Sequence, residues 1–301
     1  MPTYAGGVYQ WGGVPVGGAH YSKPWATHYF VDAATGNDGH NGRKPNRAFA
    51  TIDAAAQVMG VGDVCYINPQ AYVVGTGHAR YDEIITIDLV QSDLSFIGVG
   101  YPKNNEFGVR IRTSTAGYGF TVDGPSCHFE NIGMIVGGTG TGNFHMRNNG
   151  ATATQRGSDG PTFYKCHFKE GSDVVTGGQS PIFVDCRFHY TTGTLTIATP
   201  SVSSYGAQFI HCNWLDNNGA QNTGPCIQAG GAHVYNILIE DCTFPQIGSG
   251  GKYFIFGGTL GTGLISKCVF NKPDVHLTND MTLNTLIDVV GCYDGSGALI
   301  T

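Results

Sequence analysis

Two carboxylates and an imidazole occupy the same position in three successive copies of a short repeated segment. Asp185, His211 and Asp241 each stand third in a six-residue pattern. If these copies stack as neighbouring strands, about 4.8 Å apart, two intervals separate the carboxylates by about 9.6 Å. That distance lies at the upper end of the range for the acid and base of an inverting glycosidase. Asp185, His211 and Asp241 are therefore catalytic candidates, for cleavage of a glycosidic bond.

The same position also favours turn-forming polar residues, whatever the function of the protein. The third residues of the copies are Asn131, Lys165, Asp185, His211, Asp241 and Lys267. Asn and Asp tolerate the left-handed backbone of a tight bend. We therefore favour a structural explanation of this row and assign no catalytic residue.

The repeated segment reads apolar, any residue, polar, Cys or Ile, any residue, large apolar. Six copies begin at Phe129, Phe163, Phe183, Phe209, Ile239 and Ile265, and a weaker seventh begins at Leu94. Intervals between fourth positions range from 20 residues (Cys166 to Cys186) to 35 residues (Ile97 to Ile132). Repeats built of helices keep a fixed length, so variable intervals indicate short strands joined by loops of free length.

Because side chains alternate along a strand, the fourth and sixth residues of each copy face the same side. Each copy is then one coil of a parallel β-helix, and like residues of successive coils stack in the interior. Free cysteine packs there as a small hydrophobic residue, so we expect reduced, buried thiols. The predicted core ladder consists of Cys166, Cys186, Cys212, Cys242, Cys268, Phe168, Phe188, Trp214, Phe244 and Phe270.

The open end of such a solenoid must be covered. The stretch TIDAAAQVM, residues 51–59, predicts a capping helix with Thr51 as N-cap, and glycines at 60 and 62 end it. We predict an extended N-terminal docking arm at 1–27, a β-helix domain at 28–292 and an apolar C-terminal tail at 293–301. The arm is expected to gain order only against a partner, and the tail to be capped by another subunit.

Composition limits the class of partner. Glycine contributes 46 of 301 residues, charged residues only 13%, and the formal net charge is −6. The usual charged fraction of a globular protein is about 25%. Because its net charge is weakly negative, the chain lacks the basic surface that binding to nucleic acid requires. No apolar run is long enough to cross a membrane. The first residues do not form a signal peptide, so we expect synthesis in a cytoplasm.

No cofactor is expected, and metal ligands are few. The loop DAATGNDGHNG, residues 32–42, offers Asp32, Asn37, Asp38 and Asn41 as oxygen ligands for calcium. Asx turns explain the same four residues, and we favour that interpretation. The nine cysteines include no C-x-x-C pair, so zinc is not expected.

The stretch from Tyr29 to Pro69, YFVDAATGNDGHNGRKPNRAFATIDAAAQVMGVGDVCYINP, resembles the opening of right-handed parallel β-helix proteins. That family includes pectate-lyase-like enzymes and many bacteriophage spike and decoration proteins. The matching pieces are the GND loop, the run Phe49-x-Thr51-Ile52 and the pair Gly62-Asp63, while Ala48 replaces a common proline. The resemblance implies an all-β fold: a single-stranded right-handed parallel β-helix with a short N-terminal capping helix.

Two functions fit this fold. The first is a non-catalytic structural protein of a bacteriophage virion, a trimeric capsid decoration or auxiliary protein made in the host cytoplasm. Its partners would be itself, other virion proteins such as a capsid protein, and a surface glycan. It is favoured because the outward residues between the fourth and sixth positions include no carboxylate: Gly133, His167, Arg187, Asn213, Thr243 and Val269. The alternative is a polysaccharide-binding or -degrading β-helix protein, either a lyase or glycosidase or a tailspike-type adhesin.

Overall fold

Each copy of the repeated segment forms two short strands that meet at a one-residue bend. In the copy at Phe183, strand β18 (Ile182–Val184) ends just before Asp185, and β19 (Arg187–His189) begins two residues after it. Asp185 has a φ of 53°, and the other third-position residues have φ between 52° and 55°. The left-handed bend turns the chain from one sheet into the next, so every copy contributes a strand to each of two sheets.

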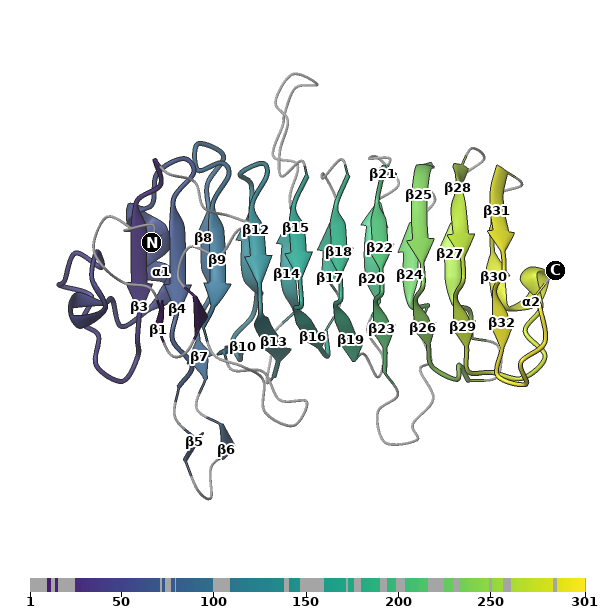
Figure 1. Cartoon of the computed structure of the whole chain (residues 1–301), viewed down its shortest axis with the longest axis horizontal. Helices are drawn as coiled ribbons and strands as arrows, with labels where there is room; N and C mark the ends of the chain where they lie inside the picture. Colours follow the sequence, from purple (N-terminus) through teal and green to yellow (C-terminus); the bar gives the residue numbers. More distant parts are fainter. Residues whose placement is uncertain are drawn as a thin grey trace.

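In the computed structural model, these coils stack into a parallel β-helix (Figure 1). The structure describes residues 10–11, 14–15, 25–70, 72–73, 77–78, 80–99, 109–137, 141–146, 160–171, 173–175, 180–189, 194–198, 204–215, 225–229, 233–248, 251–256, 261–283 and 286–300. Every strand pair within the three large sheets is parallel, which confirms the predicted fold class. No helix in these ranges is long and apolar enough to cross a membrane.

Sheet 1 precedes the bend. In spatial order its strands are β3 (His28–Val31), β4 (Val64–Ile67), β9 (Ser95–Gly98), β12 (His128–Glu130), β15 (Thr162–Tyr164), β18, β22 (Gln208–Ile210), β25 (Val234–Glu240), β28 (Gly261–Ser266) and β31 (Leu286–Val290), with β21 (Ser204–Tyr205) beside β25.

Sheet 2 follows the bend, and sheet 3 completes each coil. Sheet 2 contains β7 (Tyr81–Asp82), β10 (Val109–Thr113), β13 (Ile132–Val136), β16 (His167–Lys169), β19, β23 (Asn213–Trp214), β26 (Thr243–Phe244), β29 (Val269–Phe270) and β32 (Tyr293–Asp294). Sheet 3 contains β8 (Ile85–Ile87), β11 (Tyr118–Val122), β14 (Gly142–Met146), β17 (Asp173–Val175), β20 (Leu195–Ala198), β24 (Ile227–Ala229), β27 (Phe254–Phe256) and β30 (Met281–Thr282). Two hairpins lie outside the sheets: β1 (Gln10–Trp11) with β2 (Val14–Pro15), and β5 (Tyr72–Val73) with β6 (Gly77–His78).

Two columns of stacked aromatic rings fill the interior. On sheet 1, the first-position rings of Phe129, Phe163, Phe183 and Phe209 stack with centroids 4.8–5.0 Å apart. On sheet 2, Phe168, Phe188, Trp214, Phe244 and Phe270 stack at 4.4–5.1 Å. Full burial of each ring stabilises the fold by roughly 1.5–3 kcal/mol, so both columns hold the coils in register.

A third interior column consists of thiols. The Sγ atoms of Cys166, Cys186 and Cys212 each lie 3.4 Å from the backbone carbonyl of a phenylalanine on the preceding coil. All nine cysteines are free and buried. Burial raises the pKa of the Cys186 thiol, and a hydrogen bond with Cys242 raises the pKa of Cys268 to about 12. The Cys186 and Cys268 thiols therefore remain protonated at neutral pH.

The structure corrects the register of the weakest copy and extends the thiol column. Phe96, rather than Leu94, pairs with Phe129, and their rings stack at 5.7 Å. The copy therefore begins two residues later than the sequence predicts, because Phe96 supplies the buried ring. Cys292 also continues the column at 0% exposure, with Gly291 in the left-handed bend. The sequence pattern omits this coil because Asp294 stands where the pattern requires a large apolar residue.

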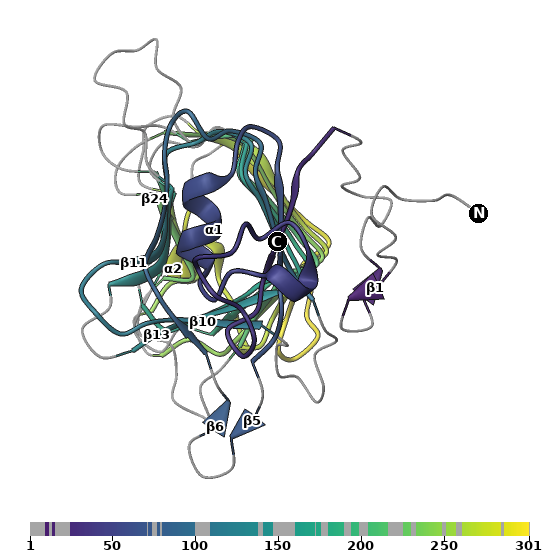
Figure 2. The ribbon, with the colours of Figure 1, turned by 90° about the vertical axis from the view of Figure 1, so that its left-hand side faces the viewer.

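A short helix covers the N-terminal end of the interior (Figure 2). Helix α1 (Ile52–Val58) has Thr51 as N-cap, whose Oγ1 accepts a hydrogen bond from the Ala54 N–H at 3.2 Å. The Glu83 carboxylate accepts from the N–H groups of Ile52 and Asp53. Asp63, from the GD pair, accepts from the N–H groups of residues 27 and 60 and so ties helix to strand. A 3₁₀ turn, η1 (Pro45–Arg47), precedes the helix.

The C-terminal end closes differently from the prediction. Ile300 is 5% exposed and packs in the chain's own core, whereas Leu299 is 54% exposed. Helix α2 (Leu277–Asp280) and a turn at Asp294 complete this end. The Asp294 carboxylate accepts hydrogen bonds from the backbone N–H groups of residues 274, 296 and 298. The chain thus covers its own last coil, and the sheet runs one strand, β32, beyond residue 292. The arm expected at 1–27 lies mostly outside the described residues.

We predict that the native protein does not react with a thiol reagent. Incubation with Ellman's reagent at pH 8 is expected to leave all thiols unmodified, because they are buried, and denaturation should release nine reactive thiols per chain. The measurement is absorbance of the released chromophore. Rapid modification of even one thiol before unfolding would contradict the buried column.

Trp214 provides a second test of the interior. Its indole N–H is buried without a hydrogen-bond partner among the described residues, whereas its neighbours in the column are phenylalanines. Trp214→Phe loses ring volume but removes an unsatisfied donor that costs about 1–3 kcal/mol, so we expect the unfolding free energy to change by less than about 1 kcal/mol. Trp214→Ala should cost about 3–5 kcal/mol in the same denaturant titration. Equal costs for the two substitutions would refute this assignment.

Candidate functional site

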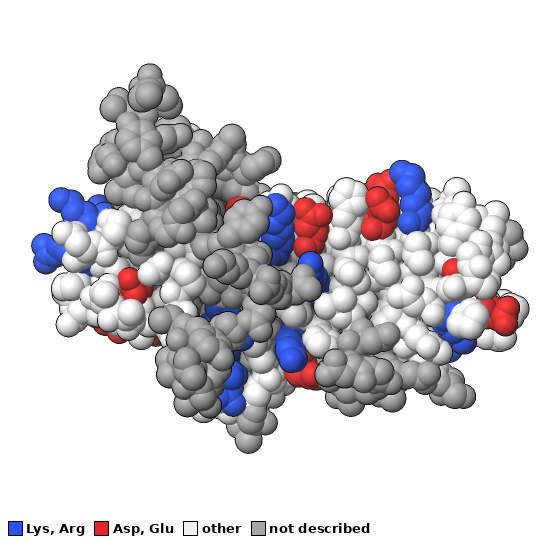
Figure 3. All heavy atoms as spheres, turned by 60° about the horizontal axis from the view of Figure 1, so that its bottom comes forward, with Lys and Arg blue, Asp and Glu red and all other residues white. Residues whose placement is uncertain are grey.

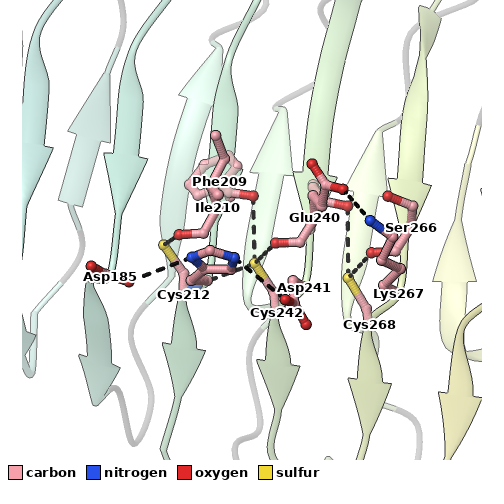
Figure 4. Close-up of polar contacts among 12 residues, drawn as sticks. Asp185, Phe209, Ile210, Cys212, Glu240, Asp241, Cys242, Ser266, Lys267 and Cys268 are labelled. Carbon is pink, nitrogen blue, oxygen red and sulfur yellow. Dashed lines mark hydrogen bonds and ion pairs between the residues drawn. The ribbon is translucent and has the colours of Figure 1, made fainter.

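The row of catalytic candidates lies along the corner where sheets 1 and 2 meet (Figure 4). Asp185, His211 and Asp241 are the bend residues of three successive coils. Their backbone N–H groups donate to carbonyls of the next coil at 3.0–3.1 Å, so the ladder fixes the order and spacing of the side chains. The structure therefore brings all three predicted residues together on one outer edge.

The imidazole of His211 lies between the two carboxylates. Its Nδ1 is 3.7 Å from an oxygen of Asp185, and its Nε2 is 3.3 Å from an oxygen of Asp241. The side chains are 39%, 56% and 58% exposed for Asp185, His211 and Asp241. Water screens such exposed pairs, so each contact contributes at most about 1 kcal/mol to stability.

Further charged side chains extend the row at both ends. The ammonium group of Lys267 lies 2.8 Å from a carboxylate oxygen of Glu240 on the same corner. This hydrogen bond holds the pKa of Glu240 below its ordinary value and that of Lys267 above its own. At the other end, the Lys165 ammonium lies 4.7 Å from the centre of the Tyr164 ring. Five consecutive coils thus each present a charged or ionisable group at the corner.

This geometry suits hydrogen bonding better than proton transfer. An inverting pair needs open space between its carboxylates for water, but here the His211 ring occupies that space. The row also lies on a convex edge in contact with solvent, whereas catalytic groups usually lie in concave sites. Exposed carboxylates and an imidazole at regular intervals can instead accept and donate hydrogen bonds to a chain of hydroxyl groups lying along the edge.

The four calcium candidates are engaged in turns. Asp32 accepts from Ala34 N–H and Thr35 Oγ1, and Asn37 accepts from Gly39 N–H. Asp38 accepts from the N–H groups of residues 50 and 51, and Asn41 from that of residue 43. These are the side-chain contacts of Asx turns and of a helix start. Within the described ranges, no group of three His, Cys, Asp or Glu side chains is arranged to hold a metal.

The structure adds cations to the outward column in which the sequence pattern places His167 and Arg187. Strand register aligns Arg110, His167 and Arg187 in one outward column of sheet 2, and Arg112 and Lys169 in another. Figure 3, which brings this side forward, shows Lys and Arg side chains interspersed with acidic ones. Burial, together with the neighbouring His189, lowers the pKa of His167 to about 3, so this imidazole is neutral. Only strand pairing shows that Arg110 belongs to this column and that Arg112 aligns with Lys169.

An aromatic pair marks the other edge of sheet 1. The rings of Tyr205 and Tyr235 stack at 4.9 Å with an angle of 20°, and Tyr205 is 45% exposed. The two tyrosines pair with each other in register, Tyr205 on β21 and Tyr235 on β25. A tyrosine four residues before the start of a copy occurs only in the copies at Phe209 and Ile239, which is too few to define a repeat.

Comparisons with known proteins identify the fold. No family model and no curated protein matches the chain. Among solved structures, a rhamnogalacturonan lyase aligns over 91% of this chain and 75% of its own, with a TM-score of 0.57 and 15% identity. The pectin methylesterase from Aspergillus niger aligns over 90% of this chain and 86% of its own, with a TM-score of 0.55 and 13% identity.

A phage protein has a more distant structural similarity to the chain. The tailspike protein gp49 from Acinetobacter baumannii bacteriophage Fri1, a capsular polysaccharide depolymerase, aligns over 91% of this chain and 58% of its own. Its TM-score is 0.37 at 10% identity. At the identities of the first two structures, the similarity establishes the parallel β-helix and not an activity.

The bend conformation predicts how the corner responds to substitution. Replacing Asp185, His211 and Asp241 together by Asn, or together by Gly, should leave the unfolding free energy within about 1 kcal/mol of the native value, since both residues adopt left-handed φ readily. His211→Val should lower it by at least about 1–2 kcal/mol, because a β-branched residue is strained there. Chemical denaturation followed by circular dichroism measures these changes. A collapse of the Gly variant would show that the side chains, rather than the bend, maintain the corner.

Proposed function

We propose that the protein binds an extended polysaccharide along the corner formed by Asp185, His211 and Asp241. The observation that carries this proposal is the row itself: exposed hydrogen-bonding groups repeat along one edge, one per coil, at about the strand spacing of 4.8 Å. A linear glycan also presents hydroxyl groups at regular intervals along its length. Each coil can therefore contact a successive part of one chain.

The fold supports this class of ligand. Two structures of similar fold, at TM-scores of 0.57 and 0.55, are named for enzymes that act on rhamnogalacturonan and pectin. The rigid sheets hold the row without a change of conformation, so binding orders few groups of the protein. Because His211 fills the space between the carboxylates, the proposal is for binding, as in an adhesin, rather than for cleavage.

The triple glycine variant tests the proposal. Binding of pectin, rhamnogalacturonan and a neutral glucan to the native protein is measured by affinity electrophoresis. At least one of these glycans should bind. The triple variant, with Gly at Asp185, His211 and Asp241, should weaken that binding at least about 10-fold, because one or two hydrogen bonds to charged groups are lost. The matched control replaces Ser180, Asn236 and Asp274 by Gly, since these exposed residues share the left-handed φ but lie off the row. The proposal would be contradicted if the control weakened binding equally, or if the native protein bound none of the three glycans.

The same glycans distinguish binding from cleavage. Release of reducing ends or of unsaturated sugars by the native protein, lost in Asp185→Asn or Asp241→Asn, would establish a degrading enzyme instead. Bound but intact glycan would establish an adhesin.

A second candidate function is a non-catalytic structural protein of a bacteriophage virion, assembled as a trimer on the capsid. The observation that favours it is the group of apolar side chains exposed on the last coils: Leu286, Val290, Tyr293 and Leu299. Exposed apolar groups that gather on one surface commonly mark a protein interface. Failure to bind any glycan, with saturable binding to purified phage capsids, would favour this candidate over the first.

A further inference from the structure

A group of apolar side chains is exposed around the C-terminal end of α1, at the N-terminal end of the β-helix (Figure 2). The group, here called the cap patch, consists of Trp25, Val58, Val61, Leu89 and Val90. Trp25 and Val90 are the most exposed, at 76% and 80%, and no member of the patch belongs to the core. The largest apolar patches on monomeric proteins are about 300–600 Å² and are often binding sites.

Short contacts hold the segments of the cap patch together. The Gln91 Nε2 donates hydrogen bonds to two carbonyl oxygens at the C-terminal end of α1, at 2.6 and 3.1 Å. The Gly62 N–H donates to the carbonyl of Ser92 at 3.1 Å. On the other side, the Nε1 atom of Trp25 lies 3.5 Å from the position that a Cβ atom at residue 62 would take. The helix end, the loop after it, the loop before Ser92 and the Trp25 indole therefore form one surface.

The segments that form most of the cap patch carry only acidic charges. Residues 52–63 and 84–93 include four aspartates and no Lys or Arg, while Arg43, Lys44 and Arg47 lie in and before the turn η1. The cap patch of a second copy would bring these aspartates against one another, which is unfavourable. An apolar occupant without acidic residues fits the patch better.

We propose that the segment 1–24 of the same chain folds back onto the cap patch and completes the N-terminal cap. Trp25, a member of the patch, is the next residue along the chain, so the effective concentration of the segment at the patch is on the order of mM. The segment contains three tyrosines, three valines and a tryptophan, and no Asp or Glu. The partner that orders the N-terminal arm is then the arm's own chain. The patch lies far along the chain from the polar corner, so this inference is independent of glycan binding.

Hydrogen exchange of the full chain, measured by mass spectrometry, tests the proposal. Amide hydrogens within residues 3–23 should exchange slowly in the native protein, whereas an isolated two-stranded hairpin such as β1–β2 gives little protection. Val61→Asp with Val90→Asp places two unpaired charges under the segment, so exchange there should become at least about 10-fold faster. The matched control, Val269→Asp with Val290→Asp, changes two exposed valines in the last coils and should leave this exchange unchanged.

Exchange in the strands of the three large sheets verifies that each variant is folded. Val61→Ser with Val90→Ser adds no charge and should also speed exchange within residues 3–23, by a smaller factor. Light scattering should give the aspartate variant of the patch the same mass as the native protein, and a fall in mass would assign the patch to a second copy and overturn the proposal. So would fast exchange of the segment in the native protein, slow exchange that survives the patch aspartates, or loss of protection in the control.

Discussion

The parallel hydrogen-bond ladder between coils is the constraint on which the rest of the structure depends. It places each residue of a copy directly over its equivalent, about 4.8 Å away. Any property of one position thus becomes a column that extends along the molecule. Flat rings are the side chains that stack best at this distance, which explains why Phe163, Phe183 and Phe209 repeat with nearly parallel planes. The variable lengths of the connecting segments do not disturb the columns, because the strand pairing keeps equivalent residues in register.

The same constraint determines the character of the candidate site. A one-residue bend requires left-handed φ, and the residues found there have short polar or long charged side chains that project from the corner. A structural requirement therefore produces an exposed polar row as a by-product. What the bend does not require is an imidazole held between two carboxylates, at 3.7 and 3.3 Å, in three consecutive coils. That arrangement is the feature that a ligand could recognise.

The three outer faces provide different chemistries on one scaffold. The corner row is polar, the face of sheet 1 is largely apolar, and sheet 2 carries Arg112, Lys169 and neighbouring cations.

The sequence by itself determined the coil, the bend and the interior. Alternation along each copy assigns Phe163 and Cys166 to the interior and Lys165 to the bend, and Thr51 marks the start of the capping helix. These assignments follow from the sequence because they depend on local properties of a strand, a turn and a helix. It misassigned the copy at Leu94 by two residues, since only the stacking of Phe96 on Phe129 fixes that register. The apolar residues on the outer face of sheet 1, the alignment of Arg112 with Lys169 on sheet 2 and the distances from His211 to its two carboxylates were decided by tertiary structure. Each depends on which coils become neighbours, and that follows from the pairing of strands separated by 20 to 35 residues rather than from any local pattern.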